Sequence, residues 1–144
     1  MLMIKDMPNS ETMWGLGHEL MEDPLSDHSV QIVRDWIHEC VSKHSSCNDY
    51  AASILPSRLI DLGKPHSSDE PHLIPSSKVP QGSPYATLSH CWGRAERTTT
   101  IRSNLAQMKK SISVSSLSPT FRDAVLVAKA LDIRYLWIDS ICII

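Results

Sequence analysis

The 144-residue sequence lacks long apolar runs and blocks of like charge, and it has only five glycines. No stretch approaches the roughly 18 apolar residues of a membrane-spanning helix, and residues 1–14 lack the apolar centre of a signal peptide. Formal net charge is −2, without the basic stripe of a nucleic-acid-binding protein. We therefore expect a cytoplasmic protein with no membrane span and no nucleic acid as partner.

Cysteine is sparse, with four residues at positions 40, 47, 91 and 142. In a chain without a secretion signal these predict thiols, mostly buried, rather than a disulfide framework. Cys40, His44 and Cys47 have a spacing that could present metal ligands, since Cys40 and His44 lie one helical turn apart. A structural zinc site needs four ligands, so the favoured interpretation is thiols beside a surface histidine, and a metal is the alternative.

Hydrophobic residues make up 42% of the chain, which is typical of a globular protein. Residues 1–25 show no sustained period and predict a disordered arm. Residues 26–63 predict an amphipathic helix over about 28–42 and a short strand within 55–63. Residues 64–84 are rich in proline and serine and predict a loop, with a short edge strand at 72–74.

The second half predicts a strand, helices and a second strand. Residues 85–90 predict a strand, and residues 102–110 predict a short helix. Ser118 and Pro119 then mark the start of a helix of about 13 residues. Residues 133–144 then have the near-continuous apolar content of a buried strand. A strand–helix–strand unit has parallel strands, so the ends of both strands meet at one edge of the sheet. That edge would gather Ser89, His90, Trp92, Asp139, Ser140 and Cys142.

These polar residues allow several chemical interpretations. Ser89, His90 and Asp139 suggest a hydrolytic triad, but neighbouring strand residues point to opposite faces, which argues against a serine hydrolase. Asp139 lies in an apolar run, where its carboxylate either ties down the loop after Ser89 or holds a ligand. Trp92, Gly93 and Arg94 could stack on a ring and contact a phosphate, although tryptophans also fill cores.

The motifs also resemble a known family. YATLSHCWG at 85–93, the following threonines with Asn104 and Leu105, and LSPTFRDAVLVAKALDIRYLWIDSICII at 117–144 resemble the N-terminal part of a fungal heterokaryon incompatibility (HET) domain. The pattern of Trp36, Cys40, His44 and Cys47, with LPSRLIDLG at 55–63, resembles the segment that often precedes it. The resemblance implies non-self recognition and programmed cell-death signalling. It also implies an α/β fold, a partial TIR- or flavodoxin-like parallel sheet with flanking helices.

Enzymes among the TIR-like relatives cleave NAD, so the resemblance implies NAD as a substrate. It places the nucleotide at Ser89, Trp92, Gly93, Arg94 and Asp139, with Asp139 as the candidate catalytic residue. Family members continue with a Gln-Asp segment and a helix that bears a glutamate, whereas this sequence ends at Ile144. We therefore expect a truncated HET-domain protein that is not catalytically competent alone.

An exposed apolar strand at the C-terminus would favour protein partners or self-association. The alternatives are an NAD glycohydrolase completed by assembly and a non-catalytic module that binds full-length HET proteins.

Overall fold

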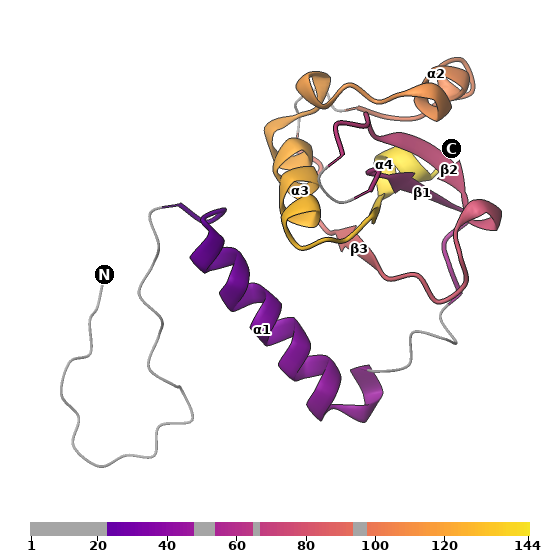
Figure 1. The fold of residues 1–144 in the computed structure, drawn as a ribbon. Coiled ribbons are helices and arrows are strands. Elements are labelled where there is room, and N and C mark those ends of the chain that lie inside the picture. The colour runs from indigo at the N-terminus through magenta and orange to yellow at the C-terminus, as the bar shows by residue number, and fades with distance from the viewer. Residues whose placement is uncertain (1–22, 48–53, 65–66, 94–97) are drawn as a thin grey trace, which may run out of the picture.

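The computed structural model describes residues 23–47, 54–64, 67–93 and 98–144 (Figure 1). Most of the predicted arm over 1–25 and the candidate phosphate ligand Arg94 lie outside these residues. None of the described helices is long and apolar enough to cross a membrane.

The described part of the chain is a mixed α/β structure. Its elements, in chain order, are α1 (Asp27–Lys43), η1 (Ser45–Cys47), β1 (Arg58–Asp61), β2 (His72–Pro75), η2 (Ser76–Lys78), β3 (Tyr85–Leu88), α2 (Leu105–Lys110), η3 (Val114–Ser116), α3 (Pro119–Ala130), β4 (Tyr135–Ile138) and α4 (Asp139–Cys142). The predicted helices and strands are confirmed, except that the last strand is shorter. Helix α3 begins as expected, because the Ser118 hydroxyl accepts a hydrogen bond from the Phe121 amide at 3.4 Å.

The four strands form one sheet in the order β2-β1-β4-β3. Strands β3 and β4 are parallel, with Tyr85 opposite Tyr135 and Leu88 opposite Ile138, which confirms the predicted strand–helix–strand unit. The sheet as a whole is mixed, because β1 runs antiparallel to both β2 and β4. The expectation of a parallel sheet is therefore wrong for β1 and β2. Parallel neighbours need a long crossover connection, usually a helix, and no helix lies between β1 and β2 in the described chain.

Strand β4 lies inside the sheet and contributes to a hydrophobic core on each face. Leu136 and Ile138 join the larger cluster with α3 residues Phe121 and Val125, while Tyr135 joins a smaller cluster. Trp137 is partly buried and packs against both clusters. Successive side chains of a strand point to opposite faces, so Leu136 and Ile138 lie on one face and Tyr135 on the other. Both faces of β4 are therefore covered.

The predicted strand over 133–144 is wrong beyond Ile138, because the chain turns into α4. Ile141 and Cys142 are buried in the larger core cluster, and Ile143 and Ile144 are exposed. The Asp139 carboxylate accepts the Ser140 amide at 2.6 Å, which satisfies an amide at the start of the helical turn. The chain after Ile138 therefore packs Ile141 and Cys142 into the larger core cluster instead of extending the sheet as a bare apolar strand.

Helix α1 lies largely apart from this core and contains no buried residue (Figure 1). Val30 and Val33 border a small hollow against α3, but Trp36 and Ile37 remain 54% and 43% exposed. Arg34 anchors the helix by donating to the Ala130 carbonyl and the Asp132 carboxylate, both at 2.6 Å. The helix was predicted correctly, although much of its apolar stripe is not packed against the sheet.

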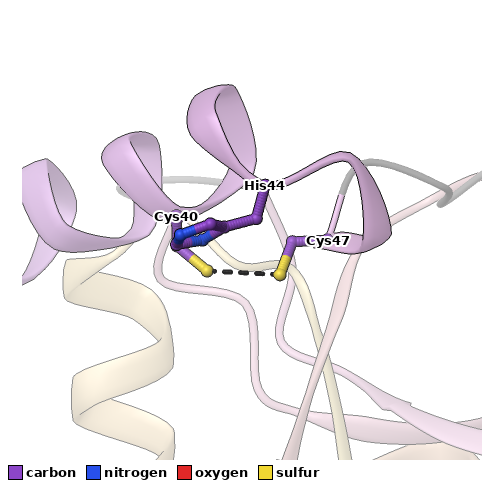
Figure 2. A group of neighbouring side chains, drawn as sticks. All are labelled: Cys40, His44 and Cys47. Carbon is purple, nitrogen blue, oxygen red and sulfur yellow. Dashed lines mark hydrogen bonds between the residues drawn. The ribbon is translucent and has the colours of Figure 1, made fainter.

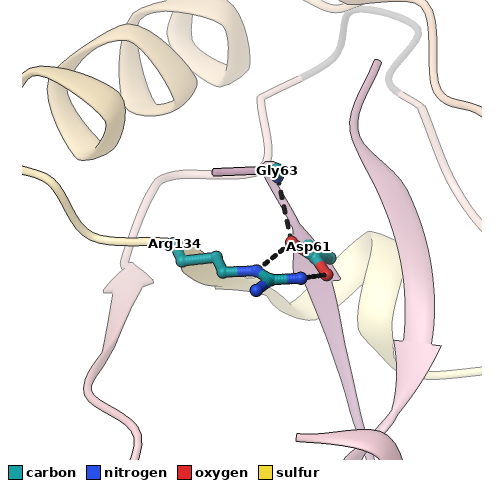
Figure 3. A network of polar contacts seen from close by, with 3 residues as sticks. All are labelled: Asp61, Gly63 and Arg134. Atoms are coloured by element: carbon teal, nitrogen blue, oxygen red, sulfur yellow. Dashed lines mark hydrogen bonds and ion pairs between the residues drawn. The ribbon is translucent and has the colours of Figure 1, made fainter. Parts of the chain in front are cut away.

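An ion pair between the buried Asp61 carboxylate and the partly exposed Arg134 guanidinium joins β1 to the start of β4 (Figure 3). Arg134 donates through Nε and Nη2 to the two oxygens of Asp61, at 2.8 and 2.7 Å, and the Gly63 amide donates to Oδ1 at 2.9 Å. Gly63 has a φ of +85°, and a Cβ there would lie 2.7 Å from Ser67 Oγ, so this turn requires glycine. Burial alone would raise the pKa of Asp61, but the Arg134 and Gly63 hydrogen bonds lower it below its ordinary value.

We expect Asp61→Asn to lower the free energy of unfolding by about 2 kcal/mol, because it removes the buried charge that holds Arg134. Urea unfolding followed by tryptophan fluorescence measures this change. Since the folded-state pKa of Asp61 is lowered, its contribution is present above the unfolded carboxyl pKa of about 3.9 and is lost as pH falls through the folded value. Stability should therefore fall below about pH 4, and less steeply in the variant.

The matched control is Asp132→Asn, which removes an ion pair with Arg34 whose side chains are 41% and 43% exposed. Such a pair contributes at most about 1 kcal/mol. Equal losses of stability from the two substitutions would contradict the role assigned to Asp61.

Candidate functional site

The ends of β3 and β4 come together as predicted, and a hydrogen bond joins them. The Trp92 indole donates through Nε1 to Asp139 Oδ2 at 2.8 Å, although the two residues are 47 positions apart. Trp92 is 52% exposed, and Ser89 and Gly93 are also exposed. The structure thus places Ser89, Trp92, Gly93 and Asp139 near one edge of the sheet, while Arg94 lies outside the described residues.

Both oxygens of Asp139 are engaged. Oδ2 accepts from the Trp92 indole and Oδ1 accepts from the Ser140 amide at 2.6 Å. This arrangement satisfies a carboxylate at the end of an apolar strand, where an unpaired charge would be costly. The sequence left two interpretations of Asp139 open. The contacts favour the one in which Asp139 holds the segment after Ser89 in place.

The contacts of His90 do not build a triad. Its ring meets Phe121 edge to face, with centroids 5.0 Å apart and planes at 89°, whereas Ser89 is exposed. His90 Nε2 is buried and has no hydrogen-bond partner among the described residues. The argument against a serine hydrolase therefore agrees with the geometry, because nucleophile and base must lie within hydrogen-bond reach.

A second set of hydrogen bonds between the segment after β3 and the turn after β4 was not predicted. Ser140, which is buried, donates through Oγ to the Thr98 carbonyl at 3.1 Å, and its own carbonyl accepts from the Thr100 amide at 2.9 Å. Asn104 closes the turn that follows, since its side chain accepts from the Ile101 amide at 2.8 Å and donates to the Thr99 carbonyl at 2.9 Å. The Ser140 and Asn104 side chains thus hold the backbone of Thr98 and Thr99, whereas the buried Thr100 hydroxyl has no hydrogen-bond partner among the described residues.

An open groove of about 420 Å³ runs between β3 and α3. Its floor and walls are mostly apolar, and it is lined by Ala86, Thr87, Leu88, Thr120, Asp123, Ala124, Val127, Ala128, Leu131, Ile133 and Leu136. Sequence reasoning missed the groove, because it depends on the spacing between α3 and a strand that has a described neighbour on only one side. An apolar groove beside an open strand edge can bind a peptide segment.

The third cluster lies at the end of α1, where Cys40, His44 and Cys47 converge (Figure 2). The Cys40 and Cys47 sulfur atoms are 3.4 Å apart, and one ligand atom from each of the three residues lies within 4.8 Å of the others. Hydrogen bonding with Cys47 raises the pKa of the Cys40 thiol. The expected surface histidine is confirmed, because His44 is exposed.

The prediction that the thiols are mostly buried is wrong for three of the four cysteines. Cys40 and Cys47 are half-buried and Cys91 is exposed. Cys142 is buried, and burial raises its pKa to about 11, so this thiol stays protonated near neutral pH. The difference arises because the end of α1 and the segment after β3 lie at the surface rather than against the sheet.

Comparison with known proteins gives one match. Residues 85–144 match the family model described as heterokaryon incompatibility protein (HET). No curated protein and no solved structure matches the chain. The matched segment begins with β3 and includes Trp92, α3, β4 and Asp139, and thus the whole of the edge described above. Residues 85–144 are therefore similar to the heterokaryon incompatibility (HET) family, and the match covers this C-terminal part of the chain.

Proposed function

We propose that this chain acts in fungal non-self recognition that leads to programmed cell death, and that it does so by binding another HET-domain protein. The match of residues 85–144 to the family model described as heterokaryon incompatibility protein carries the proposal. The partner would bind at the groove between β3 and α3. In this function the chain is an interaction module, which need not be catalytically competent alone.

The surface beside β3 supports protein binding. Strand β3 pairs with β4 on one side and with no described strand on the other. A strand edge of this kind offers unpaired backbone groups to a second chain, and the adjoining apolar groove offers side-chain contacts. Ala124 and Val127 from α3 and Leu88 from β3 line that groove.

The same surface is poorly suited to a dinucleotide. The phosphates of NAD need cationic side chains or free backbone amides. The described lining of the groove includes no lysine or arginine, and its charged member, Asp123, would repel a phosphate. These features favour an apolar protein segment as the occupant.

NAD cleavage is the second candidate function, and it would use the edge rather than the groove. The half-exposed Trp92 indole next to the Asp139 carboxylate pairs a stacking surface with an anion. In a TIR-like assembly Ser89, Trp92, Gly93, Arg94 and Asp139 would contact the nucleotide, and the anion would stabilise positive charge as the glycosidic bond breaks. Asp139 would first have to release the indole.

We expect the groove variants Thr87→Lys and Val127→Lys to weaken binding of a full-length HET-domain protein at least tenfold, because a lysine charge would be buried at the interface. The dissociation constant measured with the two purified proteins tests this. The same variants should reduce vital-dye uptake when the chain is expressed in the fungus that supplies the partner.

Leu126→Lys is the matched control, because Leu126 is 42% exposed on the same helix as Val127, which is 43% exposed, and does not line the groove. It should bind like the wild-type chain. The proposed docking surface would be wrong if Leu126→Lys weakened partner binding as much as the groove variants do, or if neither groove variant weakened it.

We expect Asp139→Ala to lower the free energy of unfolding by about 1–2 kcal/mol, because the Trp92 indole and the Ser140 amide both lose their acceptor. Thermal unfolding measures this loss, and Asp139→Asn should recover part of it because its remaining oxygen can accept one hydrogen bond. Incubation of the purified chain with NAD should release no nicotinamide. Nicotinamide release that Asp139→Ala abolishes at a temperature where the variant is folded would instead establish the enzymatic function.

A further inference from the structure

The residues at the end of α1 form a compact set of metal-binding groups outside the HET-family segment. Cys40 lies in the last turn of α1, His44 follows that helix, and Cys47 ends the 3-10 turn η1. Two backbone hydrogen bonds fix their relative positions, from the His44 amide to the Cys40 carbonyl at 3.1 Å and from the Cys47 amide to the His44 carbonyl at 3.0 Å. The three side chains are thus brought together by backbone structure.

We propose that Cys40, His44 and Cys47 bind one zinc ion through two thiolates and one imidazole. Figure 2 shows the two sulfur atoms facing one another and the His44 ring extending toward the same space. Three protein ligands are one fewer than a closed structural zinc site holds, and a water molecule would take the fourth tetrahedral position on the side where His44 is exposed.

The distances fit a zinc ion. With zinc–sulfur bonds of about 2.3 Å, a tetrahedral site places its two sulfur atoms about 3.8 Å apart. The Cys40 and Cys47 sulfur atoms are 3.4 Å apart, and the whole donor set lies within 4.8 Å. The sulfur pair therefore needs to open by a few tenths of an ångström, while the His44 ring must approach by up to about 1 Å to reach the roughly 3.5 Å that separates sulfur from nitrogen in a tetrahedral zinc site. Cys40 and Cys47 are half-buried and His44 is exposed, so these side chains have room to adjust.

The donor chemistry selects a soft or borderline cation. Thiolate and imidazole ligands suit zinc, whereas magnesium and calcium prefer oxygen ligands. The nearby Glu39 carboxylate is already paired with Lys43 at 2.6 Å, so its charge is satisfied elsewhere. Two thiolates also neutralise the two positive charges of the ion, which favours binding at half-buried cysteines.

Zinc would hold the end of α1 in place. Packing alone does little there, because this helix contains no buried residue. The ion would join the last turn of α1 to η1. This inference does not rest on the proposed function, since the three ligands lie outside residues 85–144.

The test uses the purified full chain, stripped of metal with a chelator and kept with a phosphine reductant. Titration with Co²⁺ should give thiolate-to-cobalt charge transfer and the visible bands of tetrahedral cobalt, saturating at one ion per chain. Zn²⁺ should then displace the cobalt, and competition with a chromophoric chelator gives the zinc affinity. Binding should release protons as the two thiols ionise.

The ligand variants Cys40→Ser, Cys47→Ser and His44→Ala should each weaken zinc binding at least 100-fold, since second-shell substitutions alone cost about 10- to 100-fold. Cys91→Ser removes an exposed thiol and His38→Ala a neighbouring helix histidine, and both should bind zinc like the wild-type chain. Circular dichroism checks that each variant keeps its helical content.

Three results would overturn the site. The first is the absence of the thiolate–cobalt band in the reduced wild-type chain. The second is equal zinc affinity in Cys40→Ser and Cys91→Ser. The third is a Cys40–Cys47 disulfide that persists under the reductant and leaves no thiol for the ion, a bond that the short sulfur–sulfur distance would also permit.

Discussion

Strand β4 pairs with β1 on one side and with β3 on the other, so the centre of the sheet depends on its four residues. Its apolar side chains need cover on both faces, because neither face of a continuous apolar strand can be left to solvent. Phe121 and Val125 of α3 supply part of this cover on one face. The ion pair between the buried Asp61 carboxylate and Arg134 then fixes β1 next to the start of β4, where a carboxylate without its partner would be costly.

The polar motif residues beyond β3 and β4 extend this pairing. Asp139 holds the Trp92 indole, and Ser140 holds the backbone at Thr98 and Thr100. Each bond crosses from the segment after β3 to the helical turn after β4. Asp139, the candidate catalytic residue, and Ser140 thus close the edge of the parallel pair, which explains why polar groups lie beside so apolar a strand. The proposed protein partner would instead bind at the groove between β3 and α3.

The sequence predicted what depends on local pattern. The period of α1, the cap at Ser118 and the parallel pairing of β3 with β4 all follow from residue spacing and chain order. The antiparallel placement of β1 was not predictable, because it depends on pairing between distant residues such as Ile60 and Leu136. The turn after Ile138 was also missed, since an apolar run alone does not distinguish a strand from a buried helical turn.

The HET-family segment depends on the residues that precede it. The match begins at Tyr85, yet β4 lies between β3, which is inside the match, and β1, which is outside it. Arg58 of β1 also donates to the Cys142 carbonyl at 2.8 Å, at the end of α4. If β1 were absent, β4 would expose one edge and Arg134 would lose its carboxylate. Residues 54–64 therefore belong to the same folding unit as the matched segment, and the boundary of sequence similarity does not coincide with the boundary of the described core.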